Sequence, residues 1–300
     1  MSNSGFVLLD KIAGETSFKA LFPLKRVFST KRVGHAGTLD LRASGLIIAA
    51  TGRCTRLLPF VEAKDKCYSF RLHLGYETDT LEWDGEVVEQ GDAKSISRED
   101  IERVLPQFTG DIEQIPPKYC AVKINGVRAS DLMERGRNIE LKPRKIHISE
   151  LKVIGEGEVT EGCSGKEFAT FDLICECSKG TYIRALGRDI GRALGTYACV
   201  SQIRRHRIGN VTVDKAVRGD ALTRENLLPV DEVLDFPVVR LTPEQVAVIR
   251  QGNWLPWKEK IEGVGPEGHV FAANMQGEVL ALCFYEPGRI KPKFYLGEDE

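Results

Sequence analysis

The sequence lacks an excess of charge of either sign, and it lacks any long apolar run. Its 42 Lys and Arg residues against 43 Asp and Glu residues give a formal net charge of −1, which at first argues against a polyanionic partner such as nucleic acid. The apolar stretch over residues 46–50 is the size of a strand, whereas a membrane span needs about 20 residues. The amino terminus shows no basic segment followed by an apolar one, so no secretory signal is expected. We therefore expect a cytoplasmic protein.

Paired cysteines are also missing. The eight cysteines include no CxxC pair and no histidine at a spacing suited to zinc, so we expect no metal site and mostly buried, reduced thiols. Cys175 and Cys177 alternate with their neighbours along a predicted strand, which favours burial over metal binding.

Length and local texture predict two domains of unequal size. The 300 residues are about twice the 150 expected of a single domain. Residues 227–239 contain two prolines and resemble a linker, and Thr242 begins a sequence typical of a capped helix start. The tail beyond it is rich in strand-like segments, which indicates a small β-rich domain over residues 237–300.

Local counts of charge change the first impression. Residues 16–42 carry six basic residues and one acidic residue, and residues 179–210 carry seven and one, so these segments have charges of +5 and +6. Residues 77–102 carry ten acids and two bases, a charge of −8. Two basic segments that converge in space would form an anion-binding face on a neutral molecule. The alternative is a set of ordinary solvated surfaces.

Hydrophobic periodicity predicts the elements that carry these charges. Alternation predicts strands over 68–74 and 168–177, the first of them half-buried with His73 on its polar face. The second leads into a helix over 182–194, whose arginines recur every fourth residue: Arg184, Arg188 and Arg192. Such a row suits a phosphate backbone, although a solvated helix face is the simpler interpretation for Arg188 and Arg192.

Cap and turn signals predict shorter elements. Ser17 is expected to cap a helix that Pro23 keeps short or kinked, and Ser97 is expected to cap a helix that runs to about residue 105. Asn125 and Gly126 predict a hairpin turn. Residues 155–167, rich in Gly and Glu, are predicted to form an exposed loop.

One carboxylate stands out chemically. Asp40 lies in a loop with Gly34, His35 and Gly37, and the glycines allow a tight backbone from which polar side chains project together. A carboxylate in a basic segment stays ionised and can act as nucleophile or base. The alternative is a turn-forming aspartate that bonds to its own backbone.

The segment around Asp40 resembles a known family. GHAGTLDLRASGLIIAATGRCTRL (34–57) is similar to the catalytic segment of the TruB-type tRNA pseudouridine synthases. Further motifs of that family are matched in order by DKIAGETS (10–17), KCY (66–68), TDT (78–80) with DG (84–85), and CSKGTYIRALGRDIG (177–191). PPKYCAVKINGVRASDLMERG (116–136) resembles its RNA-gripping insert, and the tail from about residue 237 resembles its PUA-type RNA-binding module.

The resemblance implies a fold and a reaction. The fold is an α+β catalytic domain over residues 1–236, built on a mixed, mainly antiparallel sheet with an RNA-gripping insert at about 112–150, followed by a PUA-like domain over 237–300. The reaction is the isomerisation of uridine 55 in the T-arm loop of tRNA to pseudouridine, after the base is flipped out of its stack. It needs no metal or redox cofactor. The implied partner is tRNA, with no membrane and no obligate protein partner, and a monomer is expected.

The resemblance also assigns roles to individual residues. Asp40 is the nucleophile, attacking either C6 of the uracil or C1′ of the ribose, and Arg184 pairs with the carboxylate and keeps it ionised. Tyr68 stacks on the extruded uracil and helps to remove the C5 proton. His35 fills the space left by the flipped nucleotide, and Tyr182 and Ile203 are pocket walls.

Some positions depart from the family pattern. Ala36 replaces a threonine, Leu41 and Arg42 replace a proline-containing pair after Asp40, and Glu82 with Trp83 interrupts the acidic run. None of these changes removes a group that the chemistry needs, but the missing proline predicts a looser loop after Asp40.

Two alternative functions stay open. One is a non-catalytic RNA-binding protein that retains the fold, and the other is an enzyme that isomerises uridine in a different RNA. The presence of Asp40, Tyr68 and Arg184 together favours catalysis, because binding alone does not require these three.

Overall fold

The structure is a computed structural model, and it describes residues 3–93, 95–161 and 167–297. The chain divides into two compact units, and each is treated by itself. Unit 1 comprises residues 1–40, 46–62 and 210–300, and unit 2 comprises residues 41–45 and 63–209. In the described part of the chain, no helix is long and apolar enough to cross a membrane.

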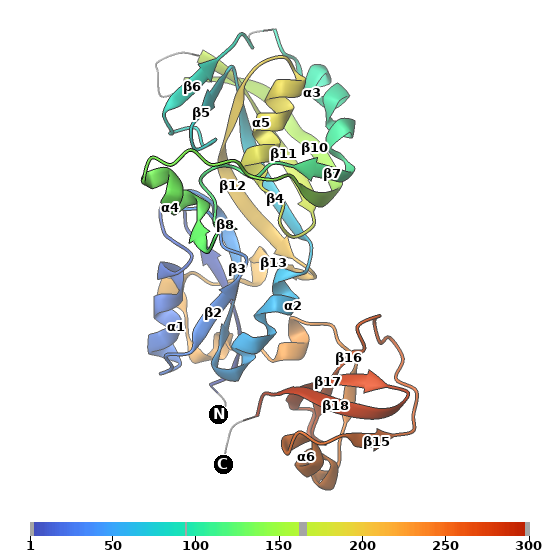
Figure 1. The fold of residues 1–300 in the computed structure, drawn as a ribbon. Coiled ribbons are helices and arrows are strands. Elements are labelled where there is room, and N and C mark those ends of the chain that lie inside the picture. Colours follow the sequence, from blue (N-terminus) through green and yellow to red (C-terminus); the bar gives the residue numbers. More distant parts are fainter. Residues whose placement is uncertain (1–2, 94, 162–166, 298–300) are drawn as a thin grey trace. The chain divides into compact units, whose positions relative to one another are not determined.

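Unit 2 is built on a mixed, mainly antiparallel sheet, as predicted (Figure 1). Its neighbouring strands run in the order β12-β4-β11-β10-β7 and pair antiparallel. Their bounds are β4 (Lys66–Leu74), β7 (Gly110–Gln114), β10 (Arg144–Glu161), β11 (Glu167–Cys177) and β12 (Ala198–Ile208). Strand β3 (Ser44–Thr51) begins by pairing parallel with β12 through Ser44 and Gly45.

The loop predicted at 155–167 is wrong over its described part. Residues up to Glu161 continue β10, and β11 begins at Glu167, with Glu158 opposite Thr170 in the register. Residues 162–166 lie outside the described residues. Glycine and glutamate weaken a strand, but pairing along a long hairpin ladder overrides that local preference.

Helix α5 (Ile183–Ala193) packs closely on this sheet because two glycines face it. A Cβ atom at Gly187 would lie 2.3 Å from Cγ1 of Val200, and one at Gly191 would lie 2.6 Å from Cβ of Ala198. Since Gly187 and Gly191 are one turn apart, they form a smooth strip along the helix. The helix therefore approaches β12 at a distance that no larger residue allows.

The smaller elements of unit 2 largely confirm the cap and turn signals. α3 (Arg98–Val104) starts with a capping box between Ser97 and Asp100 and is followed by η3 (Leu105–Phe108). The hairpin of β8 (Lys123–Ile124) and β9 (Val127–Arg128) turns through Asn125 and Gly126, whose φ angles are 50° and 86°. The other elements are β5 (Tyr76–Thr78), β6 (Val87–Gln90) and α4 (Ala129–Glu134).

Unit 1 contains the amino-terminal strands and short helices. β1 (Gly5–Lys11) pairs with β3, and β2 (Val33–Ala36) lies on the other edge of β3. The remaining elements are η1 (Lys19–Leu21), α1 (Phe22–Val27), η2 (Gly52–Leu57), α2 (Leu58–Glu62), β13 (Val211–Thr212), η4 (Val213–Lys215), η5 (Gly219–Ala221), η6 (Arg224–Asn226) and η7 (Val230–Glu232). The predicted helix after Ser17 is short, as expected with Pro23 in its first turn, but Ser17 does not cap it.

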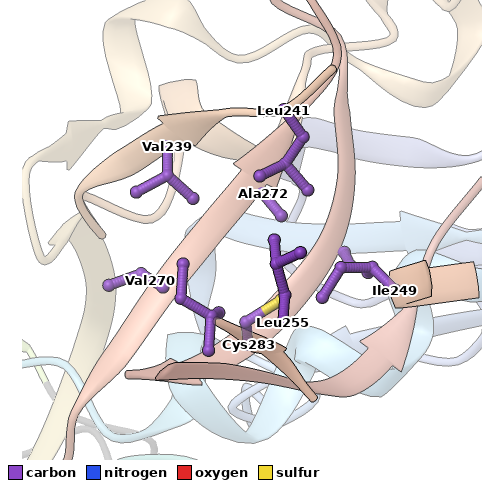
Figure 2. Packing of buried hydrophobic residues seen from close by; sticks show 9 residues of the cluster. Val239, Leu241, Ile249, Leu255, Val270, Ala272 and Cys283 are labelled. Atoms are coloured by element: carbon purple, nitrogen blue, oxygen red, sulfur yellow. The ribbon is translucent and has the colours of Figure 1, made fainter. Parts of the chain in front are cut away.

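The carboxyl-terminal part of unit 1 forms a separate small sheet. Its strands run in the order β14-β16-β17-β18-β15, with bounds β14 (Val238–Arg240), α6 (Pro243–Arg250), β15 (Leu255–Trp257), β16 (His269–Ala273), β17 (Val279–Glu286) and β18 (Gly288–Tyr295). Figure 2 shows its core, in which Leu241, Ile249 and Leu255 pack among residues of β14, β16 and β17. This is the small β-rich module that the sequence predicts, and its boundary at residue 237 stays a prediction.

Candidate catalytic site

The loop that carries Asp40 is fixed from behind by a buried serine. Ser17 is 2% exposed, and its hydroxyl donates to the carbonyl of Leu39 (3.0 Å) and accepts from the amide of Leu39 (2.9 Å). Just before it, Gly37 turns the chain with a φ of 68°. The backbone immediately before Asp40 is therefore held in one conformation by a side chain 22 residues earlier in the chain.

The loop after Asp40 is also held, contrary to the looser loop expected there. Arg42 forms an ion pair with Asp84 at 2.7 Å. Three residues on, Gly45 has a φ of 100°, and a Cβ atom there would lie 2.3 Å from the carbonyl oxygen of Arg205. The missing proline is thus replaced by an ion pair and by close backbone contact with β12, although Arg42 is 59% exposed in that pair, so the pair itself contributes little.

Tyr68 lies in the middle of the unit 2 sheet. It is opposite Cys175 of β11 on one side and Arg205 of β12 on the other, and it is partly buried. Neighbouring strands on both sides fix its backbone, while its partial exposure leaves part of the side chain accessible. The alternating pattern over 68–74 predicts this placement.

His73 lies further along β4 and is buried rather than solvated. It is 7% exposed, and its Nε2 lies 2.7 Å from the hydroxyl of Ser201. Burial, reinforced by the nearby charge of Arg71, lowers the pKa of His73 to about 4. His73 is therefore a neutral buried residue. It lies on the polar face of the strand as predicted, but the ring of Trp83 stacks on it with centroids 6.4 Å apart, so this face is not open to solvent there.

Tyr182 is held at the start of α5 by a buried glutamine. The side-chain amide of Gln114 donates to the carbonyl of Tyr182 (3.2 Å), and its oxygen accepts from the amide of Tyr182 (2.8 Å). Gln114 is 2% exposed. Sequence reasoning missed it, although a polar residue on the buried phase of strand β7 is a detectable signal.

Arg184 is buried where three segments of unit 2 meet. It is 5% exposed, and its guanidinium donates to the carbonyls of Thr80 and Tyr119, each at 2.9 Å. Its Nε lies 3.9 Å from the carboxylate of Glu82. The arginine therefore joins the TDT run, the insert and α5, so it has a structural role beside any catalytic one.

The arginines of α5 do not form one row of solvated cations: Arg184 and Arg188 are buried, whereas Arg192 is exposed, as the simpler interpretation expects. Arg188 is 9% exposed and donates to the carbonyl of Ile115 (2.9 Å) and to Asp189. Arg192 pairs with Glu77 at 3.1 Å. Arg184 also lies near Glu82, and Arg42 forms an ion pair with Asp84. Together these arginines neutralise part of the acidic segment 77–102.

The two remaining sequence-predicted residues have distinct settings. His35 is on β2, opposite Ala49, and is partly buried. Ile203 is 6% exposed and lies where the register of β12 against β4 shifts between Ser201 and Arg204, next to Gln202 with a φ of 51°. Within unit 2 the structure thus places Tyr68, Tyr182, Arg184 and Ile203, while His35 and Asp40 belong to unit 1.

Comparisons with known proteins agree with the motif match. The model of the TruB family pseudouridylate synthase N-terminal domain matches residues 25–183. A protein named tRNA pseudouridine synthase B from Caulobacter sp. (strain K31) is 37% identical over 303 residues, covering 96% of this chain and 94% of the relative. A protein of the same name from Mycobacterium sp. (strain KMS) is 38% identical over 291 residues, covering 96% and 94%.

A solved structure supports the fold. A chain in a structure of an H/ACA RNP bound to a substrate RNA containing 2'-deoxyuridine superposes with a TM-score of 0.70, covering 99% of this chain and 86% of that chain at 20% identity. At that identity the likeness concerns the fold, and it extends over both the sheet of unit 2 and the small carboxyl-terminal sheet. Together with the family model and the near full-length relatives, it leads to one conclusion: the chain belongs to the TruB family of pseudouridylate synthases.

Proposed function

We propose that this protein isomerises uridine 55 in the T-arm loop of tRNA to pseudouridine, with Asp40 as the nucleophile. The observation that carries the proposal is the near full-length similarity to proteins named tRNA pseudouridine synthase B, and the match to the family model spans the motif that contains Asp40. The clamp of Ser17 on Leu39 supports it, because a nucleophile acts efficiently when its backbone is pre-positioned.

The chemistry balances within the substrate. The carboxylate of Asp40 forms a bond to C1′ or C6, the bond between N1 and C1′ breaks, the uracil turns, and a bond forms between C5 and C1′. The bond to Asp40 breaks again, so that the carboxylate is regenerated. The proton on C5 is then removed and N1 gains a proton, so no redox partner is needed. Because the target atoms are inaccessible in a stacked loop, the uridine must first be flipped out.

The other site residues keep the roles that the resemblance gives them. Tyr68 stacks on the flipped uracil and assists removal of the C5 proton, and its partly exposed position in the sheet leaves the side chain available. Arg184 is the cationic partner that the resemblance gives to Asp40. His35 fills the space of the flipped nucleotide, and Tyr182 and Ile203 are pocket walls.

The RNA partner is supported by exposed cations outside α5. Residues 116–145, which include the β8–β9 hairpin, carry an excess of exposed basic side chains: Lys118, Lys123, Arg128, Arg135, Arg137, Lys142, Arg144 and Lys145. We assign this insert and the carboxyl-terminal module to tRNA binding, with affinity that falls as salt rises. The protein acts as a monomer without an obligate protein partner.

The test is a direct assay of the product. Unmodified tRNA transcript is incubated with the protein, and pseudouridine is mapped by carbodiimide modification and primer extension. Wild type should modify uridine 55, Asp40→Asn should not, and the exposed Asp220→Asn should behave as wild type. A wild-type protein that leaves uridine 55 unchanged would refute the function, and an active Asp40→Asn would refute the nucleophile.

Arg184→Met separates the two roles of that arginine. The variant should still bind tRNA while its rate of isomerisation falls strongly, and its unfolding midpoint should drop because the carbonyls of Thr80 and Tyr119 lose their donor. An equal loss of tRNA binding and rate in a folded Arg184→Met would recast the residue as a phosphate contact.

A further inference from the structure

Two exposed phenylalanines lie at the starts of η1 and α1, the short helices that precede the loop carrying Asp40. Leu21, Leu24 and Phe28 face the core and are nearly fully buried. On the outer side, Phe18 is 60% exposed and Phe22 is 49% exposed. Burying a phenylalanine side chain contributes about 1.5–3 kcal/mol, so two rings left in water on one helical turn need a reason.

The two rings are arranged as a unit. Their centroids are 5.4 Å apart at an interplanar angle of 81°. The ammonium of Lys25 lies 5.1 Å from the centroid of Phe18 and 5.2 Å from that of Phe22. Edge-to-face contact and a shared cation hold both side chains in place, so less conformational entropy is lost when a ligand binds them.

The chain segment that carries the pair is basic. Residues 16–39 contain Lys19, Lys25, Arg26, Lys31 and Arg32 and no acidic residue. Lys19, between the two rings in sequence, and Arg26, one turn after Phe22, are exposed. We define the aromatic-basic surface as Phe18, Phe22, Lys25, Lys19 and Arg26.

We propose that the aromatic-basic surface binds unpaired nucleotides of the tRNA substrate at a place distinct from the reacting uridine. Exposed aromatic faces stack on bases of any sequence, and neighbouring cations neutralise the phosphates that connect them. A second protein surface would match the rings but not a segment with five cations and no acid, so charge complementarity selects RNA as the occupant. This inference rests on the proposed function, because it takes the substrate to be tRNA.

Binding and catalysis are measured separately to test it. The dissociation constant for unmodified tRNA is measured with full-length protein that carries Asp40→Asn, so that no reaction occurs. The single-turnover rate is measured at saturating tRNA with protein that keeps Asp40. Phe18→Ala with Phe22→Ala should raise the dissociation constant about 10-fold and leave the saturated rate unchanged. Lys19→Gln should lower the slope of log affinity against log salt by about 1.

Matched controls guard against trivial effects. Val88→Ala, at an exposed apolar residue of β6 (53% exposed), should leave binding unchanged, because this strand belongs to no segment assigned to tRNA binding. Unfolding curves should show the double variant folded, because both rings lie outside the core. A dissociation constant for the double variant equal to that of wild type would overturn the proposal.

A crosslinking experiment identifies the occupant directly. With p-benzoylphenylalanine in place of Phe18, irradiation should join the protein to tRNA at a nucleotide other than uridine 55. A covalent dimer of the protein instead of an RNA adduct would overturn the proposal and show self-association. If the protein with p-benzoylphenylalanine at position 18 crosslinks to tRNA but wild type forms no pseudouridine, the proposed function fails while the RNA contact stands.

Discussion

Ser17→Ala should uncouple the catalytic loop from the rest of unit 1. The substitution removes a hydroxyl that makes two hydrogen bonds to the backbone of Leu39, at 2.9 and 3.0 Å. Ser17 is 2% exposed and Leu39 is 5% exposed, so water does not readily replace the lost partner. A buried polar group left without a partner costs about 1–3 kcal/mol, which gives a loss of about 2–6 kcal/mol for the amide and carbonyl of Leu39 together.

Two measurements test this value. Urea unfolding should show the loss in the free energy of unfolding, and single-turnover isomerisation at saturating tRNA should slow by about tenfold or more, because Asp40 is no longer pre-positioned. The affinity for tRNA should change little, since Ser17 is buried.

The neighbouring hydroxyl provides the control. Thr16 is exposed, and its Oγ1 accepts a hydrogen bond from the amide of Lys19 at 3.1 Å, so Thr16→Ala should cost less than about 1 kcal/mol and leave the rate unchanged. Equal stability of the Ser17→Ala and Thr16→Ala proteins, or a wild-type rate in the former, would refute the reasoning.

Three other perturbations have expected outcomes. Burial holds the pKa of His73 at about 4, below its ordinary 6.5. The contribution of the neutral ring to the free energy of unfolding is therefore fully present above pH 6.5 and should fall as the pH approaches 4, by roughly 2.5 kcal/mol at pH 4.5. Urea unfolding of His73→Gln should lose this pH dependence, and an unchanged pH dependence would show that other groups cause it. Alanine at Arg42, at Asp84 and at both should reveal a coupling energy of about 0.2–1 kcal/mol, because Arg42 is 59% exposed; a coupling several times larger would contradict the view of the pair as a weak tether. Gly187→Ala should destabilise the protein by about 1–3 kcal/mol, since its Cβ would lie 2.3 Å from Cγ1 of Val200; an unchanged melting temperature would mean that α5 shifts freely on the sheet.

Local sequence signals predicted most elements of the fold. The alternation over 68–74 became β4, the capping box at Ser97 began α3, and Asn125 with Gly126 closed the β8–β9 hairpin. These features depend on periodicity and on backbone preferences of single residues, so they survive in any tertiary context. The extension of β10 through residues 155–161 was missed, because a long ladder stabilises a strand that its own residues do not favour.

The sequence predicted which residues form the candidate site, but not which side chains hold their backbone in place. The family resemblance identified Asp40, Tyr68 and Arg184, and their roles stay predictions that the assays above test. Ser17 holds the backbone before Asp40 in unit 1, and Gln114 holds the backbone of Tyr182 in unit 2, through contacts 22 and 68 residues apart in the chain. No local pattern reveals the partner of either side chain, because these hydrogen bonds exist only once distant segments are packed together.

The sequence by itself determined the chemistry that the chain carries and the positions of its cations and acids, since both are properties of residue type and order. Only the tertiary structure decided what those charges do. The sequence counts the arginines of α5 as part of a basic segment, but in the structure they pair with Glu77, Glu82 and backbone carbonyls within unit 2. The basic residues near Phe18 and Phe22 lie instead in a stretch of sequence without acids. The physical reason is that a charge acts over a few ångströms in space, and the fold sets which charges are that close.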